Sequence, residues 1–142
     1  MKGEKAIKHQ LRRLPAWILT GLTVVLILWL TLAPDPLPND EPILLFPGAD
    51  KVVHGLMFGF LTFVVLVDWA RGRDFRAVRW PVCLVAAASA TCFGIAIEFA
   101  QRAMGLGRGF EVLDMLADGI GAFLTATCWI IAEHVRRRSR SD

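Results

Sequence analysis

Apolar residues are concentrated in four blocks along the chain, and most charged residues lie between the blocks. The blocks cover residues 16–33, 52–69, 80–98 and 115–132. Whole stretches lack the polar face that a helix or strand of a soluble domain keeps toward water. A membrane-spanning helix needs about 20 mostly apolar residues. The pattern therefore predicts an all-α membrane protein, a bundle of four transmembrane helices.

Length and composition agree with this interpretation. The chain has 142 residues, 55% of them hydrophobic, and a mean hydropathy of +0.50. This length suits one domain over residues 1–142, with a basic tail at 133–142. The first block is expected to stay in place rather than to be cleaved as a signal peptide. Its apolar run of 18 residues exceeds the usual signal-peptide core of about 7–15 residues. The only plausible cleavage site follows Ala33, and Pro34 directly after it makes a poor site.

The positive charges predict an orientation. Thirteen of the 16 lysines and arginines lie before the first block, between the second and third blocks, or after the fourth. In a four-span bundle these three places share one side, and basic residues mark the cytoplasmic side. Both termini are therefore expected to be cytoplasmic. Insertion and anionic lipid account for the net charge of +3, so no nucleic-acid partner is predicted.

Polar residues with helical spacing stand at the other, outer ends of three blocks. Asp50 and His54 are four residues apart, as are Asp114 and Asp118, so each pair shares a helix face. A charged side chain costs roughly 2.5–3.5 kcal/mol at the centre of a membrane helix, which favours faces that turn inward and meet. We predict one outward-facing polar cluster, made of Asp50, Lys51, His54, Glu98, Gln101, Arg108, Asp114 and Asp118.

Other interpretations of these residues stay open. Asp50 also suits a helix N-terminus, where an acid is stabilised by the dipole, and Lys51 could reach toward lipid headgroups. The whole set could be a structural ion-pair network. No metal site and no cofactor are predicted, because His9 and His134 lie in the tails and no Cys-x-x-Cys pair occurs.

Small residues recur every four positions on three of the blocks. This spacing lets helix backbones approach closely in lipid. Such faces also allow a second copy of the chain to associate, so a homo-oligomer is a further expectation. The residues concerned are Gly55 and Gly59, then Ala86, Ala90 and Gly94, and finally Ala117 and Gly121.

Two segments, DKVVHGLMFGFL and EFAQRAMGLGRGFEVLDMLADGIGAFL, together resemble the VanZ-like family. The sequence departs from that family's pattern at Asp118, where asparagine is usual. The resemblance implies a multi-pass protein of the bacterial cytoplasmic membrane with a polar site. The family takes its name from a protein associated with low-level resistance to teicoplanin. The matching residues are Asp50, Lys51, His54, Phe58, Glu98, Gln101, Arg108, Asp114 and Gly121.

Two functional hypotheses follow. In the first, the cluster binds a lipid headgroup, a lipid-linked cell-wall precursor or a glycopeptide antibiotic, and Lys51 and Arg108 meet phosphate or carboxylate. In the second, the chain is an intramembrane hydrolase or transferase whose candidate catalytic residues are His54, Glu98 and Asp114. His54 would be the general base, and water or a substrate hydroxyl the nucleophile, because the cluster contains no serine or cysteine. A transporter is less favoured, since the polar groups lie on one side only.

Overall fold

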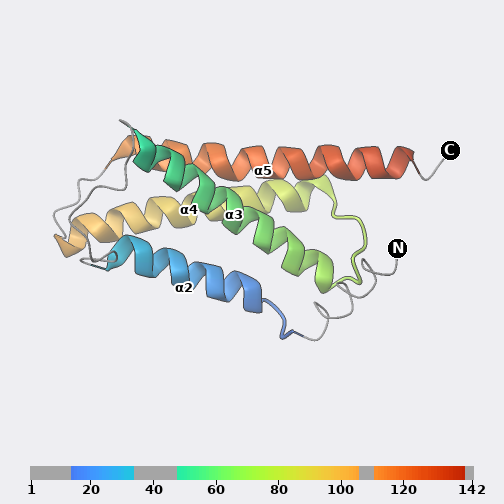
Figure 1. Ribbon diagram of the computed structural model, residues 1–142, viewed down its shortest axis with the longest axis horizontal. Coiled ribbons are helices and arrows are strands. Elements are labelled where there is room, and N and C mark those ends of the chain that lie inside the picture. The colour runs from blue at the N-terminus through green and yellow to red at the C-terminus, as the bar shows by residue number, and fades with distance from the viewer. Residues whose placement is uncertain (1–13, 34–47, 106–110, 140–142) are drawn as a thin grey trace.

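The computed structural model describes residues 14–33, 48–105 and 111–139. Over these ranges the chain forms four helices and no strand (Figure 1). The helices are α2 (Ile18–Leu32), α3 (Ala49–Arg71), α4 (Trp80–Met104) and α5 (Val112–Arg138). The prediction of an all-helical bundle is therefore confirmed. Arg108 lies outside the described residues, as do most residues of the loop between the first two apolar blocks.

The helices differ in length. Three of them, α3, α4 and α5, have 23, 25 and 27 residues and are long and apolar enough to cross a membrane. The first, α2, has 15 residues, which is about 22 Å at 1.5 Å per residue and less than the roughly 30 Å of a bilayer's hydrocarbon core. The last, α5, begins at Val112 and continues to Arg138, beyond both ends of its predicted block. Three of the four predicted spans thus have the expected length.

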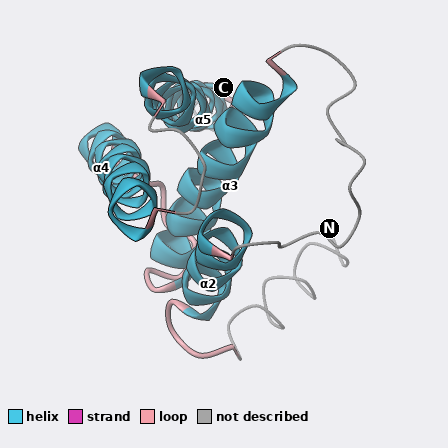
Figure 2. Cartoon of the chain, turned by 90° about the vertical axis from the view of Figure 1, so that its left-hand side faces the viewer, coloured by secondary structure: helices cyan, strands magenta, loops and turns pink. Residues whose placement is uncertain are grey.

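Helix α3 lies in the middle of the bundle. It contacts α2, α4 and α5, and Figure 2 shows it between α2 and α5 with α4 alongside. Consecutive helices run in opposite directions (Figure 1). One end of the bundle therefore holds the last turns of α2 and α4 and the first turns of α3 and α5. We call it the cluster end, and we call the opposite end, which carries Arg71, Arg79 and Arg136, the basic end.

The small residues bring α3 and α5 into backbone contact. A Cβ atom added to Gly121 would overlap the Gly55 carbonyl and lie 2.6 Å from its carbon and 2.8 Å from the Gly55 Cα. A Cβ on Gly59 would lie 3.1 Å from the Gly121 oxygen. The four-residue spacing therefore marks a helix crossing, as predicted. These faces are already paired within one chain, so self-association through them stays a prediction.

At the basic end, two charged residues of α3 hold the start of α2. Asp68 Oδ2 accepts hydrogen bonds from the Thr20 backbone N–H and hydroxyl, each at 2.9 Å. Thr20 is the third residue of α2, so Asp68 satisfies one of the N–H groups that a helix start leaves unpaired. Arg71 pairs with Asp68 and donates to the carbonyls of Leu14 and Pro15 at 3.0 and 3.4 Å. Nothing in the sequence pattern had predicted this clamp between Asp68, Arg71 and the start of α2.

Candidate functional site

An imidazole and two carboxylates form the centre of the polar cluster. His54 Nδ1 lies 3.0 Å from Asp118 Oδ1, and His54 Nε2 lies 3.9 Å from Asp114 Oδ2. The Asp118 side chain is 1% exposed, against 16% for His54 and 13% for Asp114. A carboxylate accepts hydrogen bonds, so the bond to Asp118 favours the tautomer with the proton on Nδ1. That tautomer leaves the Nε2 lone pair directed toward Asp114.

Lys51 joins the first turns of α3 and α5. Its ammonium pairs with the carboxylates of Asp50 and Glu111, and its Nζ lies 3.2 Å from Asp114 Oδ1. Glu111 was not among the predicted site residues. It directly precedes α5 and stands three residues before Asp114, a spacing that places both acids on one face. This three-residue spacing to Asp114 is the sequence signal that could have identified Glu111 as a site residue.

Two residues near the end of α4 tie this helix to its neighbours. Glu98, 2% exposed, accepts a hydrogen bond from the backbone N–H of Glu111 at 3.2 Å, and so contacts the start of α5. Gln101, 5% exposed, donates from Nε2 to the carbonyl oxygen of Thr31 at 2.9 Å, in the last turn of α2. Glu98 thus belongs to the cluster, whereas the amide of Gln101 binds the α2 backbone.

Gly94 of α4 makes room for the buried carboxylate of Asp118. A Cβ at this glycine would overlap the Asp118 carboxylate, 3.0 Å from its Cγ, and would lie 3.1 Å from Phe58 Cε1. Asp118 Oδ2, on this side, has no hydrogen-bond partner among the residues that the structure describes. The small-residue stripe of α4 thus serves the polar site as well as helix packing.

The cluster carries an excess of negative charge. Of the eight predicted residues, seven are described, and they lie at the cluster end as predicted, with Gln101 bound to α2. Lys51 pairs with the carboxylates of Asp50, Glu111 and Asp114. The other two carboxylates, those of Glu98 and Asp118, contact the Glu111 backbone N–H and His54 instead. Among the described residues of the cluster, negative charges therefore outnumber positive ones.

Part of the cluster also has the composition of a metal-binding site. His54, Glu98 and Asp114 come from three different helices, and each offers one ligand atom. These three atoms all lie within 4.8 Å of one another. A second set with the same property consists of Asp50, Glu111 and Asp114. No metal site was predicted from the sequence, because only carboxylates remained as possible ligands beside His54.

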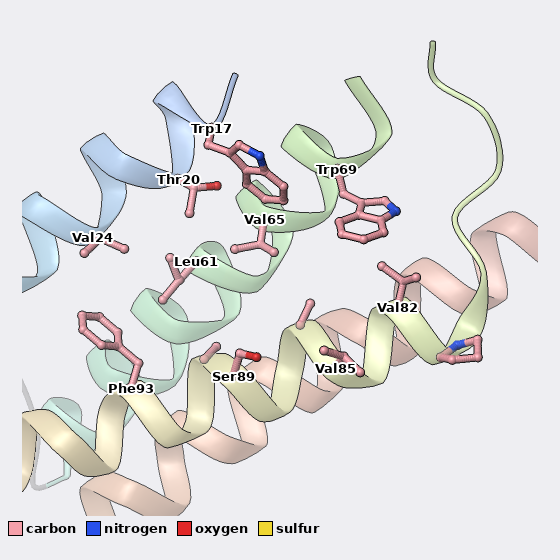
Figure 3. A pocket seen from close by; sticks show the side chains of 13 residues that line it. Trp17, Thr20, Val24, Leu61, Val65, Trp69, Val82, Val85, Ser89 and Phe93 are labelled. Carbon is pink, nitrogen blue, oxygen red and sulfur yellow. The ribbon is translucent and has the colours of Figure 1, made fainter. Parts of the chain in front are cut away.

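Two apolar grooves run along the bundle. One, of about 760 Å³, lies between α3 and α5, begins at Lys51 and continues past Leu56, Phe60 and Ile120. The other, of about 450 Å³, lies between α2, α3 and α4. Figure 3 shows the latter, with Trp17 and Trp69 near one of its ends. Of the two, the α3–α5 groove includes a charged residue of the cluster.

Comparison with known proteins identifies the family. The VanZ/LLP1 family model matches residues 9–133. No curated protein and no solved structure matches the chain. The matched range includes every residue of the polar cluster and all but the last turn of α5. The chain therefore belongs to the VanZ/LLP1 family.

Proposed function

We propose that this protein lies in the bacterial cytoplasmic membrane and binds, at its polar cluster, the headgroup of an envelope lipid or of a lipid-linked cell-wall precursor. The observation that carries the proposal is the position of the α3–α5 groove, which begins at Lys51 and is otherwise lined mainly by apolar residues. A hydrocarbon chain in this groove would place its headgroup at the cluster. A glycopeptide antibiotic is the alternative ligand, and it would use the cluster without needing the groove.

The distribution of arginines supports an outward-facing cluster. Arg71, Arg73, Arg76 and Arg79 lie at the end of α3 or in the link to α4, and Arg136, Arg137 and Arg138 form the last turn of α5. All of them are at the basic end. Because basic residues near helix ends favour the cytoplasmic side, the cluster end is expected to face the outside.

The chemistry of the cluster suits a ligand rich in hydrogen-bonding groups. Lys51 offers ammonium donors to phosphate or hydroxyl oxygens, although three carboxylates already surround it. The acids Asp114 and Glu111 accept hydrogen bonds from hydroxyl or amino groups. The ligand is therefore expected to present donors such as sugar hydroxyls to these acids, and Lys51 remains the candidate, with Arg108, for any phosphate that it carries.

A second candidate is an intramembrane hydrolase or transferase. The bond between His54 and the buried Asp118 favours it, because a carboxylate on Nδ1 orients the ring and leaves Nε2 to accept a proton from water or a substrate hydroxyl. The orienting acid is then Asp118 rather than Glu98 or Asp114. Ser89 lines the other groove, so water or a substrate hydroxyl remains the proposed nucleophile.

Blocking the α3–α5 groove tests the binding proposal. Ile120→Trp places an indole in this groove, whereas Val85→Trp does the same in the groove of Figure 3 and is the matched control. Both positions are exposed on the bundle, at 60% and 66%. We expect Ile120→Trp to weaken binding of a fluorescent polyprenyl phosphate in nanodiscs about tenfold, a loss of about 1.4 kcal/mol. Val85→Trp should bind like the wild type.

Two results would reject this proposal. Equal affinities for the wild type and Ile120→Trp would show that the α3–α5 groove holds no chain. An equal loss in both tryptophan variants would show that the probe associates with any apolar surface of the bundle. Binding of teicoplanin that is insensitive to Ile120→Trp but abolished by Lys51→Ala would favour the glycopeptide alternative.

A further inference from the structure

The ligand atoms of the cluster are close enough to share one ion. We infer that His54, Glu98 and Asp114 bind a divalent transition-metal ion, and that this ion meets the anionic headgroup of the proposed ligand. The inference deepens the proposed function and rests on it only for the headgroup. The metal site itself stands on the three ligand atoms within 4.8 Å of one another, one from each of α3, α4 and α5.

The orientation of His54 is that of a metal ligand. Histidines that bind metals usually donate their other ring N–H to a carboxylate, which fixes the ring and makes the free nitrogen more basic. Asp118 is the carboxylate in this role, because its Oδ1 lies 3.0 Å from His54 Nδ1 and its side chain is 1% exposed. Nε2 then faces Asp114. Four residues thus divide into three ligands and one residue that positions a ligand.

The described part of the site holds buried negative charge that a cation would offset. Glu98 and Asp118 are both at least 98% buried, and burying a carboxylate is costly unless it is paired. Lys51 contacts Asp50, Glu111 and Asp114 instead. The second carboxylate oxygen of Asp118 has no hydrogen-bond donor in the described part of the chain. It lies against Gly94, which stands one helical turn before Glu98 in α4. A divalent ion beside Glu98 would offset this buried negative charge.

The donor set indicates the class of metal. One imidazole and two carboxylates suit Zn²⁺ or Mn²⁺, while a site without thiolates disfavours the softest ions. Three protein ligands leave coordination positions for water or for a ligand oxygen, as in catalytic zinc sites. An anionic phosphate could occupy such a position despite the acids around it. Nε2 cannot hold a metal and accept a proton at once, so the inference favours binding over a general-base role for His54.

Titration with Mn²⁺ alone, followed by electron paramagnetic resonance on the full-length protein in detergent, tests the site. We expect one bound ion in the wild type. Asp114→Asn and Glu98→Gln should each weaken binding at least about tenfold, as even the loss of a residue that only positions a ligand typically does. Glu133→Gln is the matched control, because Glu133 is a buried acid of α5 at the basic end. Its affinity should equal that of the wild type.

A thermal melt of each variant with and without Mn²⁺ guards against misfolding. The wild type and Glu133→Gln should gain stability with the ion, whereas a folded Asp114→Asn should gain less at the same Mn²⁺ concentration. Equal Mn²⁺ affinities in the wild type, Asp114→Asn and Glu98→Gln would overturn the inference, as would no saturable binding to the wild type. Polyprenyl phosphate binding that survives EDTA would reject the metal bridge yet keep the proposed function. Saturable Mn²⁺ binding without any lipid binding would keep the metal site and reject the proposed function.

Discussion

Replacing Asp68 by alanine is expected to destabilise the folded protein by about 3–5 kcal/mol, the typical cost of removing one partner of a buried ion pair. The Asp68 side chain is fully buried, and that of its partner Arg71 is 5% exposed. Alanine would leave the guanidinium without its carboxylate. It would also remove the acceptor of the two hydrogen bonds from Thr20. The start of α2 should then detach from α3.

Unfolding by sodium dodecyl sulfate in mixed micelles measures this loss. Thr20→Val is the graded control, because it removes the hydroxyl bond but keeps the backbone N–H bond, and should cost only about 1 kcal/mol. Asp68→Asn should fall between the two variants, since it keeps an acceptor and loses the charge. The clamp would be refuted if Asp68→Ala unfolded at the same detergent fraction as Thr20→Val.

Replacing Gly121 by alanine is expected to cost about 3 kcal/mol, the upper end of the range for overpacking a core. The added methyl group would overlap the Gly55 carbonyl and lie 2.6 Å from its carbon. The obstacle is backbone rather than a flexible side chain, so relief requires α3 and α5 to separate. This separation would also disturb the polar cluster, whose residues lie on these two helices and α4.

Gly21→Ala is the matched control for this substitution. Gly21 lies within α2, and apart from the backbone of its own helix a Cβ there would meet no atom of the described residues within 4 Å. The same denaturation experiment should leave Gly21→Ala at least as stable as the wild type, because alanine is a better helix former than glycine. If Gly121→Ala and Gly21→Ala unfold together, the close crossing of α3 and α5 is wrong.

The sequence predicted the number and class of the helices better than the length of the first. Hydropathy marks the apolar residues, but the local backbone conformation sets where this helix begins and ends. Trp17, directly before the helix, has a left-handed conformation with φ 60°, and Ala33, the residue before Pro34, is extended with φ −68° and ψ 137°. A residue that precedes proline is disfavoured in the helical region. The apolar block over 16–33 therefore yields a helix of only 15 residues.

The composition of the cluster was also largely predictable, whereas its pairings were not. Helical spacing puts Asp114 and Asp118 on one face of their helix, and the cost of charge in lipid turns that face and His54 inward. The choice of Asp118 as the partner of His54 depends on how α3 and α5 cross, which is set by the Gly55–Gly121 contact between helices far apart in sequence. Asp68 lies inside the apolar block over 52–69 and was not predicted to have a role, because no local pattern links it to Thr20.

Cysteine accessibility in intact bacterial cells tests the central claim most directly, namely that the polar ends of α3 and α5 share one side of the membrane, facing outward. Single cysteines are introduced as Lys51→Cys, Asp114→Cys or Ser139→Cys into a chain whose Cys83, Cys92 and Cys128 are replaced by alanine. We expect a membrane-impermeant maleimide to label the first two in intact cells, and Ser139→Cys, at the basic end, only after permeabilisation. Labelling of Lys51→Cys and Asp114→Cys from opposite sides of the membrane would contradict the account.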